Sequence, residues 1–180
     1  IMSNVAKSYR FGIESVFGLN LGRKINIQAN LTLSKNKIND YTEYVDDWDT
    51  GLQQENYLGK TSISFSPEIV GSGIMEYTPH KNIHLFLNAK YVGKQYIDNS
   101  SSHGRMLNPY FVSNFKIDYD LPLKFLKRTT LSFQVLNLFN EQYESNAWVY
   151  RYLYGGKEYA MDGYFPQAGR HYMCSINIQF

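Results

Sequence analysis

The sequence predicts an all-β fold, an antiparallel transmembrane β-barrel of the outer-membrane class. The clearest sign is the final segment, where every second residue is apolar: Tyr172, Cys174, Ile176, Ile178 and Phe180. Alternate side chains of a strand point to opposite faces, so this segment has one apolar and one mainly polar face. The pattern recurs in segments long enough to cross a bilayer, which takes roughly 9–11 residues.

We expect about seven strands, with ranges 9–18, 24–35, 68–77, 82–96, 110–121, 129–139 and 170–180. The second shows the best alternation, with Ile25, Ile27, Ala29, Leu31 and Leu33 on one face. The third is the weakest, because Gly71 and Gly73 blur its faces. Soluble strands are typically about five or six residues long, so strand length favours a membrane barrel.

The connections between these strands alternate in length. Short ones follow the first, third and fifth strands, over residues 19–23, 78–81 and 122–128. Long ones follow the second, fourth and sixth, over about residues 36–67, 97–109 and 140–169. Outer-membrane barrels combine short periplasmic turns with long extracellular loops. The last strand should therefore end at the periplasmic side, with Phe180 as the C-terminus.

Composition excludes several classes of protein. No apolar run reaches the roughly 18 residues of a spanning helix. The net charge of +2 gives no reason to expect nucleic acid as a partner. Aromatic residues make up 16% of the chain, and barrels concentrate aromatics at both membrane interfaces. Because no GxSxG, HExxH, P-loop or Rossmann pattern occurs, we expect neither an enzyme nor a bound cofactor or metal.

Seven strands alone do not make a bacterial barrel. Bacterial single-chain barrels normally have even strand numbers, and an open sheet edge is not tolerated in a bilayer. The chain begins at Ile1 without a signal peptide, although an outer-membrane protein must be exported. We therefore interpret residues 1–180 as one C-terminal segment of a larger barrel, with lipid of the outer membrane around it.

Four blocks of the sequence resemble TonB-dependent outer-membrane receptors. In chain order they are Arg10–Glu14, Lys90–Asn99, Val135–Tyr143 and Gly163–Arg170. The first two resemble the family's "r.GvE" strand start and its "YvgkqYlDN" strand end. The last two resemble its "NLFdkkY" block and its closing "G.y.P.pGR" block. The blocks follow the family's order and extend over nearly the whole chain.

This resemblance implies a 22-stranded barrel, the size of outer-membrane transporters, of which this chain supplies the last seven strands. It also implies energy-coupled import of a scarce, large nutrient such as an iron chelate, haem, cobalamin or a glycan. The plug domain, the TonB box that contacts the TonB complex and the earlier strands are absent from these residues. Transport would therefore belong to the longer protein. A surface lipoprotein that caps the loops is a further partner left open.

The resemblance assigns a role to the last strand as well. Tyr172, Ile176, Ile178 and Phe180 resemble the C-terminal signal that the barrel-assembly machinery reads. The physical basis would be strand addition to an exposed edge, with alternate side chains giving specificity. The other interpretation, compatible with the first, is a plain lipid-facing strand end.

Candidate ligand-binding residues lie in two long connections. One concentrates aromatic and cationic side chains suited to a large or anionic ligand: Trp148, Tyr150, Arg151, Tyr152 and Tyr154. In the other, His103 beside Arg105 could contact haem or a metal chelate. The alternatives, which the sequence favours, are a self-packed loop or a strand extension that projects beyond the membrane, and an ordinary exposed histidine. The acidic residues at 46, 47 and 49 are interpreted as a solvated loop rather than a Ca²⁺ site.

Two other classes of function remain open at this point. A non-transporting barrel, serving as an adhesin or a structural protein, would lack a plug domain upstream. A soluble all-β binding domain would be monomeric without detergent. The apolar face from Ile25 to Leu33 argues against the soluble domain.

Overall fold

The computed structural model describes Val5 and residues 7–123 and 125–180. Its regular elements are strands: β1 Lys7–Leu21, β2 Ile25–Asp47, β3 Leu52–Ser62, β4 Ile69–His80, β5 Ile83–Val92, β6 Gln95–Tyr96, β7 Met106–Leu107, β8 Tyr110–Leu121, β9 Arg128–Leu136, β10 Glu144–Tyr154, β11 Lys157–Pro166 and β12 His171–Gln179. The described residues contain no helix that is long and apolar enough to cross a membrane. The all-β prediction is confirmed.

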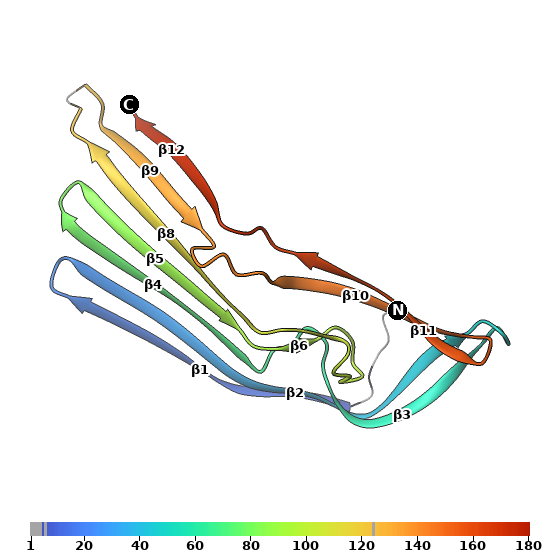
Figure 1. The fold of residues 1–180 in the computed structure, drawn as a ribbon. Helices are drawn as coiled ribbons and strands as arrows, with labels where there is room; N and C mark the ends of the chain where they lie inside the picture. Colours follow the sequence, from blue (N-terminus) through green and yellow to red (C-terminus); the bar gives the residue numbers. More distant parts are fainter. Residues whose placement is uncertain (1–4, 6, 124) are drawn as a thin grey trace.

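A single antiparallel sheet carries most of the chain. Along its main body the neighbouring strands are β1, β2, β4, β5, β8, β9 and β12, each paired antiparallel with the next. Each predicted strand range overlaps one of them. Figure 1 shows the sheet as a curled, open half-barrel. β1 pairs with β2 and β12 pairs with β9, so among the described strands each of the two outermost has one free edge.

The register gathers the apolar positions of these strands on one face, called here the apolar face. One row across the sheet shows the rule, running through Leu19, Ile27, Met75, Leu87, Phe115, Val135 and Tyr172. The opposite face is mainly polar, with a row through His84, Asp118, Ser132 and Ser175. A shift by one residue in any strand would exchange its two faces, so the pattern specifies the register.

Aromatic side chains mark both borders of the apolar face. Tyr91 on β5 stands opposite Phe111 on β8, close to the long connections. Tyr77 and Tyr119 lie near the short turns at the other end, Tyr119 opposite Ile83. Their side chains are 37% and 40% exposed, with no covering protein layer. This is the arrangement that amphipathic rings adopt at two membrane interfaces.

The short and long connections separate to opposite ends of the sheet, as predicted. Residues 22–24, 81–82 and 122–127 join consecutive strands at one end, where the C-terminus also lies (Figure 1). All three long connections leave from the other end. Much of their length is strand: residues 36–67 contain the upper part of β2 and all of β3, and residues 140–169 contain β10 and β11.

Two predicted strands end earlier than expected. The fourth was expected to reach Tyr96, but β5 stops at Val92 and the short β6 follows after Gly93 and Lys94. The sixth was expected to reach residue 139, but β9 stops at Leu136. Asn137 has φ 52°, in the left-handed region where a strand cannot continue.

The tip of the β10–β11 hairpin returns to β2. Tyr152 and Leu153 pair in parallel with Asp46 and Asp47, and the Trp48 amide donates to the Leu153 carbonyl at 2.9 Å. This links segments about a hundred positions apart in the sequence. The long connections therefore form one packed unit, here called the loop region: residues 36–67, 93–109 and 140–169.

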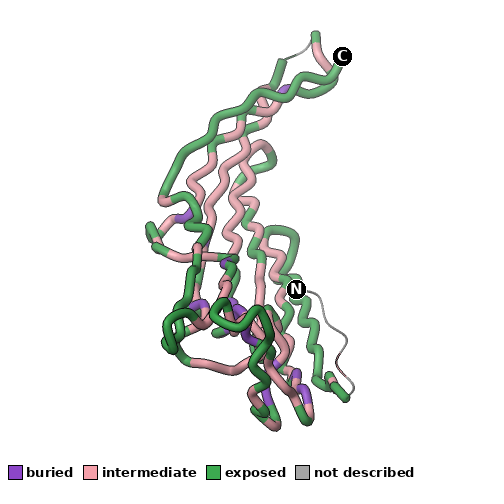
Figure 2. The backbone as a smooth tube through the Cα atoms, turned by 90° about the vertical axis from the view of Figure 1, so that its right-hand side faces the viewer, coloured by how far each residue is buried: buried purple, intermediate pink, exposed green. Residues whose placement is uncertain are grey.

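The buried core lies at the loop end of the molecule. Ile97, Leu107 and Ala147 form a buried cluster with Val149 packed against it. Figure 2 shows most buried residues at this end, while the strands of the sheet are exposed or half-buried. Large apolar side chains on the apolar face stay open to the surroundings, for example Ile13 at 70% and Ile176 at 64%.

Candidate functional site

An ion network in the loop region holds two of the predicted ligand-binding residues. Glu43, on the upper part of β2, contacts the guanidinium groups of both Arg105 and Arg151, at 3.5 Å and 2.5 Å. Arg105 also pairs with Asp98 at 2.8 Å, and Arg151 Nε donates to Glu158 at 2.6 Å. The Glu43, Arg105 and Arg151 side chains are 13%, 16% and 12% exposed. The two arginines therefore brace the loop region and are not free to bind an anion.

The protonation equilibria of this network follow from its burial and pairing. Burial of the Arg151 guanidinium opposes its charge, but the hydrogen bonds that it donates to Glu43 and Glu158 outweigh this and raise the pKa of Arg151. Burial, followed by the nearby charges of Glu43 and Asp98, raises the pKa of the Tyr41 phenol. Arg151 stays charged and Tyr41 stays neutral at any physiological pH.

Aromatic rings from two loops stack beside this network. Trp48, in the β2–β3 turn, stacks on Tyr152 with ring centroids 4.0 Å apart. Tyr152 in turn stacks on Tyr159 of β11 at 5.5 Å. The Trp48 indole donates to the Tyr150 hydroxyl at 3.2 Å, and that hydroxyl donates to Asp46 at 2.8 Å. Two of the predicted residues, Tyr150 and Tyr152, are thus close neighbours of Trp48, which was not among the ligand candidates.

Trp148 and Tyr154 belong to the same face of the β10–β11 hairpin, Trp148 near the middle of β10 and Tyr154 at the tip. Trp148 covers Gly163 on the opposite strand, where any side chain would overlap the indole. Tyr154 is 57% exposed at the tip. Trp48, Trp148, Tyr154 and Tyr159 together present a surface of exposed rings, 44% to 57% accessible. This ring surface could hold a planar or apolar ligand.

His103 and Arg105 are not brought to the ring surface as a pair. His103 is exposed and meets Tyr96 edge-on, with centroids 6.4 Å apart. Arg105 points to Asp98, Glu43 and the Ser100 hydroxyl, with which its Nη2 forms a bond of 2.5 Å.

The acidic segment is not the fully solvated loop that the sequence suggested. Asp49 accepts the amides of Gly155 and Gly156 at 3.0 and 3.1 Å. Asp46 accepts hydrogen bonds from Gln53 and Tyr150, and these lower the pKa of its carboxyl. Within the described ranges, no group of three or more His, Cys, Asp or Glu side chains is placed to hold a metal ion.

Two of the family-like blocks fold onto each other. Asn137 is 4% exposed, and its Nδ2 donates to the carbonyls of Glu141 and Ala168 at 2.9 and 3.1 Å. Asn140 accepts the Arg170 amide at 2.9 Å. Gly169 sits so close that a Cβ there would lie 2.8 Å from Asn140 Oδ1. The asparagines at 137 and 140 and the Gly-Arg pair are therefore one structural unit that joins β9 to the start of β12.

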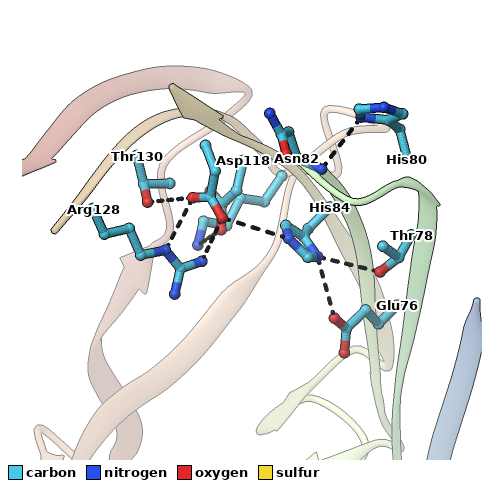
Figure 3. A network of polar contacts seen from close by, with 10 residues as sticks. Glu76, Thr78, His80, Asn82, His84, Asp118, Arg128 and Thr130 are labelled. Atoms are coloured by element: carbon cyan, nitrogen blue, oxygen red, sulfur yellow. Dashed lines mark hydrogen bonds and ion pairs between the residues drawn. The ribbon is translucent and has the colours of Figure 1, made fainter. Parts of the chain in front are cut away.

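A polar cluster near the short turns was not predicted as a site. His84 lies 3.8 Å from both Glu76 and Asp120 and 3.2 Å from the Thr78 hydroxyl (Figure 3). Asp120 also pairs with Arg128 at 2.8 Å and accepts a hydrogen bond from the Thr130 hydroxyl at 2.6 Å. The sequence placed His84 on the polar face, but its partners lie on three other segments and leave no local signal.

All nine residues of β12, the predicted assembly strand, are exposed. β12 uses one edge for β9 and leaves the other free within the described sheet. Tyr172, Ile176 and Phe180 are 63%, 64% and 85% exposed on the apolar face. Ile178, 47% exposed, shares that face.

Comparison with solved structures identifies the class of fold. The chain superposes on the siderophore receptor PiuA of Acinetobacter baumannii with a TM-score of 0.70, over 95% of its own length and 22% of PiuA, at 17% identity. The closed form of the ferric-catecholate import receptor Fiu of E. coli gives 0.65, over 94% of this chain and 20% of Fiu, at 18% identity. A mutant of the ferric enterobactin receptor PfeA of Pseudomonas aeruginosa gives 0.58, over 96% and 22%, at 20% identity.

These comparisons show the fold of one part of an iron-receptor barrel. The chain spans about a fifth of the length of each of these receptors. No family model matches the sequence, and no curated protein matches it. The resemblance to TonB-dependent outer-membrane receptors, first seen in four sequence blocks, is confirmed at the level of the fold.

Proposed function

We propose that residues 1–180 form the C-terminal wall of an outer-membrane receptor barrel that imports a scarce nutrient. The observation that carries the proposal is the combination of the receptor-like fold with one continuous apolar face. That face leaves side chains such as Phe17 and Leu33 exposed at 56% and 46%. A water-soluble protein rarely exposes a contiguous apolar area of this size, whereas a bilayer would cover it.

The geometry supports an orientation in the membrane. The rows between the two aromatic borders would cross the bilayer, the short turns and Phe180 would face the periplasm, and the loop region would face outward. The free edges of β1 and β12 would pair with other strands of the full barrel, because unpaired backbone groups are too costly in lipid. This supports a larger barrel, for which we propose the size of 22 strands.

The ring surface of the loop region is the part of this chain best placed to contact the nutrient. Arg105 and Arg151 are withdrawn from the proposed binding set because Glu43 and its neighbours already pair them. Trp148, Tyr154 and the stacked Tyr150 and Tyr152 remain. Aromatic rings give large contact area at low conformational cost. An iron chelate is favoured as the nutrient, since the similar structures are iron receptors.

The proposal also names partners. Uptake would draw energy through the TonB complex, which would engage a part of the protein outside these residues. The barrel-assembly machinery would read β12 through its free edge, and a surface lipoprotein could cap the loop region.

Uptake of labelled iron chelates by cells tests the function. Deleting the gene for the full-length protein should abolish uptake of one class of chelate, and restoring the gene should recover it. An uncoupler that collapses the proton gradient should stop uptake but leave binding at the cell surface. A full-length protein that resides in the outer membrane yet neither binds nor imports iron chelates, haem, cobalamin or glycans would be a non-transporting barrel.

A further inference from the structure

Two adjoining hollows lie on the apolar side of the sheet where it meets the loop region. The lower one, about 310 Å³, is lined by Phe11, Ile13 and Leu33 among others. The upper one, about 410 Å³, is lined by polar side chains that include Lys37 and Lys94. Glu68 and Ile69 line both hollows, so the two form one continuous depression.

The lower hollow is apolar and open. Phe11, Ile13 and Ile69 are 63%, 70% and 41% exposed. β4 begins at Ile69, and the chain just before it lies beside β2. The Ser34 amide donates to the Glu68 carbonyl there at 2.8 Å. An extended hydrocarbon chain fits such a groove, since burying apolar surface is favourable in proportion to its area.

The upper hollow carries an excess of positive charge. Lys37 donates to the Ser62 hydroxyl at 2.9 Å and pairs with Glu68 at 3.2 Å. Lys94 is exposed and forms no ion pair with any described residue. Lys35, also exposed and also without a described ion pair, lines the lower hollow just beneath. Three ammonium groups thus face a single carboxylate.

Hydroxyl groups complete the polar part. The Tyr91 and Tyr96 phenols and the Ser62 hydroxyl line the same hollow as Lys37 and Lys94. Ammonium and hydroxyl groups together bind phosphate oxygens through charge-assisted hydrogen bonds. Lysines at the border of a lipid-facing surface also extend toward the headgroup level.

We propose that this depression binds one phosphate-bearing lipid of the outer leaflet. An acyl chain lies along Phe11, Ile13 and Leu33, and the phosphate sits between Lys37 and Lys94. The occupant is a lipid rather than free phosphate because the cationic hollow continues directly into the apolar one. The inference rests on the proposed membrane orientation, since only that orientation puts the depression at headgroup level.

Native mass spectrometry of the full-length protein, reconstituted in phosphatidylcholine nanodiscs containing phosphatidic acid, tests the site. The double variant Lys37→Gln/Lys94→Gln should retain about thirtyfold less phosphatidic acid, since each basic residue near an anionic headgroup contributes a factor of about five. The charge-matched variant Lys90→Gln/Lys157→Gln changes the polar face and the tip of β11, so it should retain the lipid like the unaltered protein.

The outcomes separate the two proposals. Equal retention of phosphatidic acid by both double variants would overturn the lipid site. Displacement of the lipid by excess inorganic phosphate would also overturn it, because it would indicate a site for the free anion. Failure of the full-length protein to enter nanodiscs would instead contradict the membrane orientation. Iron-chelate uptake by the Lys37→Gln/Lys94→Gln variant should stay unchanged, because neither lysine belongs to the ring surface.

Discussion

The main sheet and the loop region are built on opposite principles, although both consist of strands. The sheet keeps its apolar side chains outside, where Phe17, Ile176 and their neighbours have no protein cover. The loop region has a buried apolar core as well as its exposed rings, with Leu107 and Ile38 each 1% exposed. The loop region also holds the tightest ion network, around Glu43, and this network is half-buried.

This contrast shows which solvent each region is built for. A surface that faces lipid needs apolar side chains and complete backbone pairing. A surface that faces water needs a buried core of its own and polar groups that satisfy one another. The chain meets both requirements by changing from one kind of surface to the other at the level of Gly93 and Asn137. Strands of the sheet end there and strands of the loop region follow.

The largest effect should come from breaking the loop network at its shared carboxylate. Glu43→Gln leaves Arg105 and Arg151 with one fewer counter-charge in a half-buried place. Breaking a buried ion pair costs about 3–5 kcal/mol. Amide hydrogen exchange in residues 95–107 and 144–166 should accelerate by at least about a hundredfold, while β5 and β8 should exchange as before.

Glu55→Gln provides the matched control. Glu55 lies on β3, is exposed and has no ion-pair partner within the described chain, so its exchange pattern should match the unaltered protein. If Glu43→Gln also left exchange in both loop segments unchanged, the network would be incidental and the loop region would depend on its apolar cluster alone.

A smaller loss should follow from placing a charge on the apolar face. Leu87 lies in the middle of β5, between Met75 and Phe115. Leu87→Arg should destabilise the full-length protein in lipid by about 2–4 kcal/mol, the cost of Arg near the bilayer midplane of a barrel. Chemical unfolding in lipid vesicles measures it.

The neighbouring residue sharpens this test. Asn88→Arg changes the polar face at the same level, and it should cost less than about 1 kcal/mol because water can reach it. Equal losses for Leu87→Arg and Asn88→Arg would mean that the apolar face does not contact lipid. In that case the main sheet would be surrounded by water, as the loop region is.

The junction between the regions should give the next effect in size. Asn137→Ala removes three side-chain hydrogen bonds, including one accepted from the Glu141 amide at 2.8 Å. It also places Ala at φ 52°. Each net bond is worth about 1 kcal/mol and the left-handed backbone costs about 1 kcal/mol more, so partial compensation by water leaves a loss of about 2–3 kcal/mol.

Asn137→Gly separates the two causes, because glycine accepts the backbone conformation and lacks only the side chain. Its thermal unfolding midpoint in detergent should lie between those of the unaltered protein and Asn137→Ala. A midpoint for Asn137→Gly at or below that of Asn137→Ala would show that the positive φ carries no cost.

The strands of the main sheet could be predicted because the pattern that specifies each strand lies within a short stretch of sequence. In a strand between lipid and a polar interior, apolar and polar residues alternate, as they do in residues 25–33. The loop strands were missed because both of their faces are partly apolar. On β10, aromatic Tyr150 and Tyr152 alternate with Val149 and Leu153, so the contrast disappears.

The site could be predicted only in part. The ring residues of β10 are visible as a run of aromatics, but their partner Trp48 lies a hundred positions away. Glu43 is separated from Arg105 by 62 positions, and nothing local distinguishes a paired arginine from a ligand-binding one. The upper part of β2 was missed for a related reason, since a bulge at Asp40, with φ 55°, shifts the alternation there.

The smallest effect should come from lowering the pH, which weakens the contact between the β2–β3 turn and the tip of the β10–β11 hairpin. Hydrogen bonds from Gln53 and Tyr150 hold the pKa of Asp46 below its ordinary value. A carboxyl with a lowered folded pKa stabilises the folded state fully above its unfolded pKa of about 4 and loses that contribution as the pH falls through the folded value. Acid should therefore loosen the stack of Trp48 on Tyr152 below about pH 4.

Fluorescence of Trp48, isolated in a Trp148→Phe background, reports this change. Asp46→Asn should remove the acid step, because the amide oxygen still accepts from Tyr150 and does not titrate in this range. A step that persists in Asp46→Asn would show that the Asp46 carboxyl does not cause it. Either way, the sheet should keep its hydrogen exchange pattern through the titration, since lipid and backbone pairing, not this carboxylate, hold it.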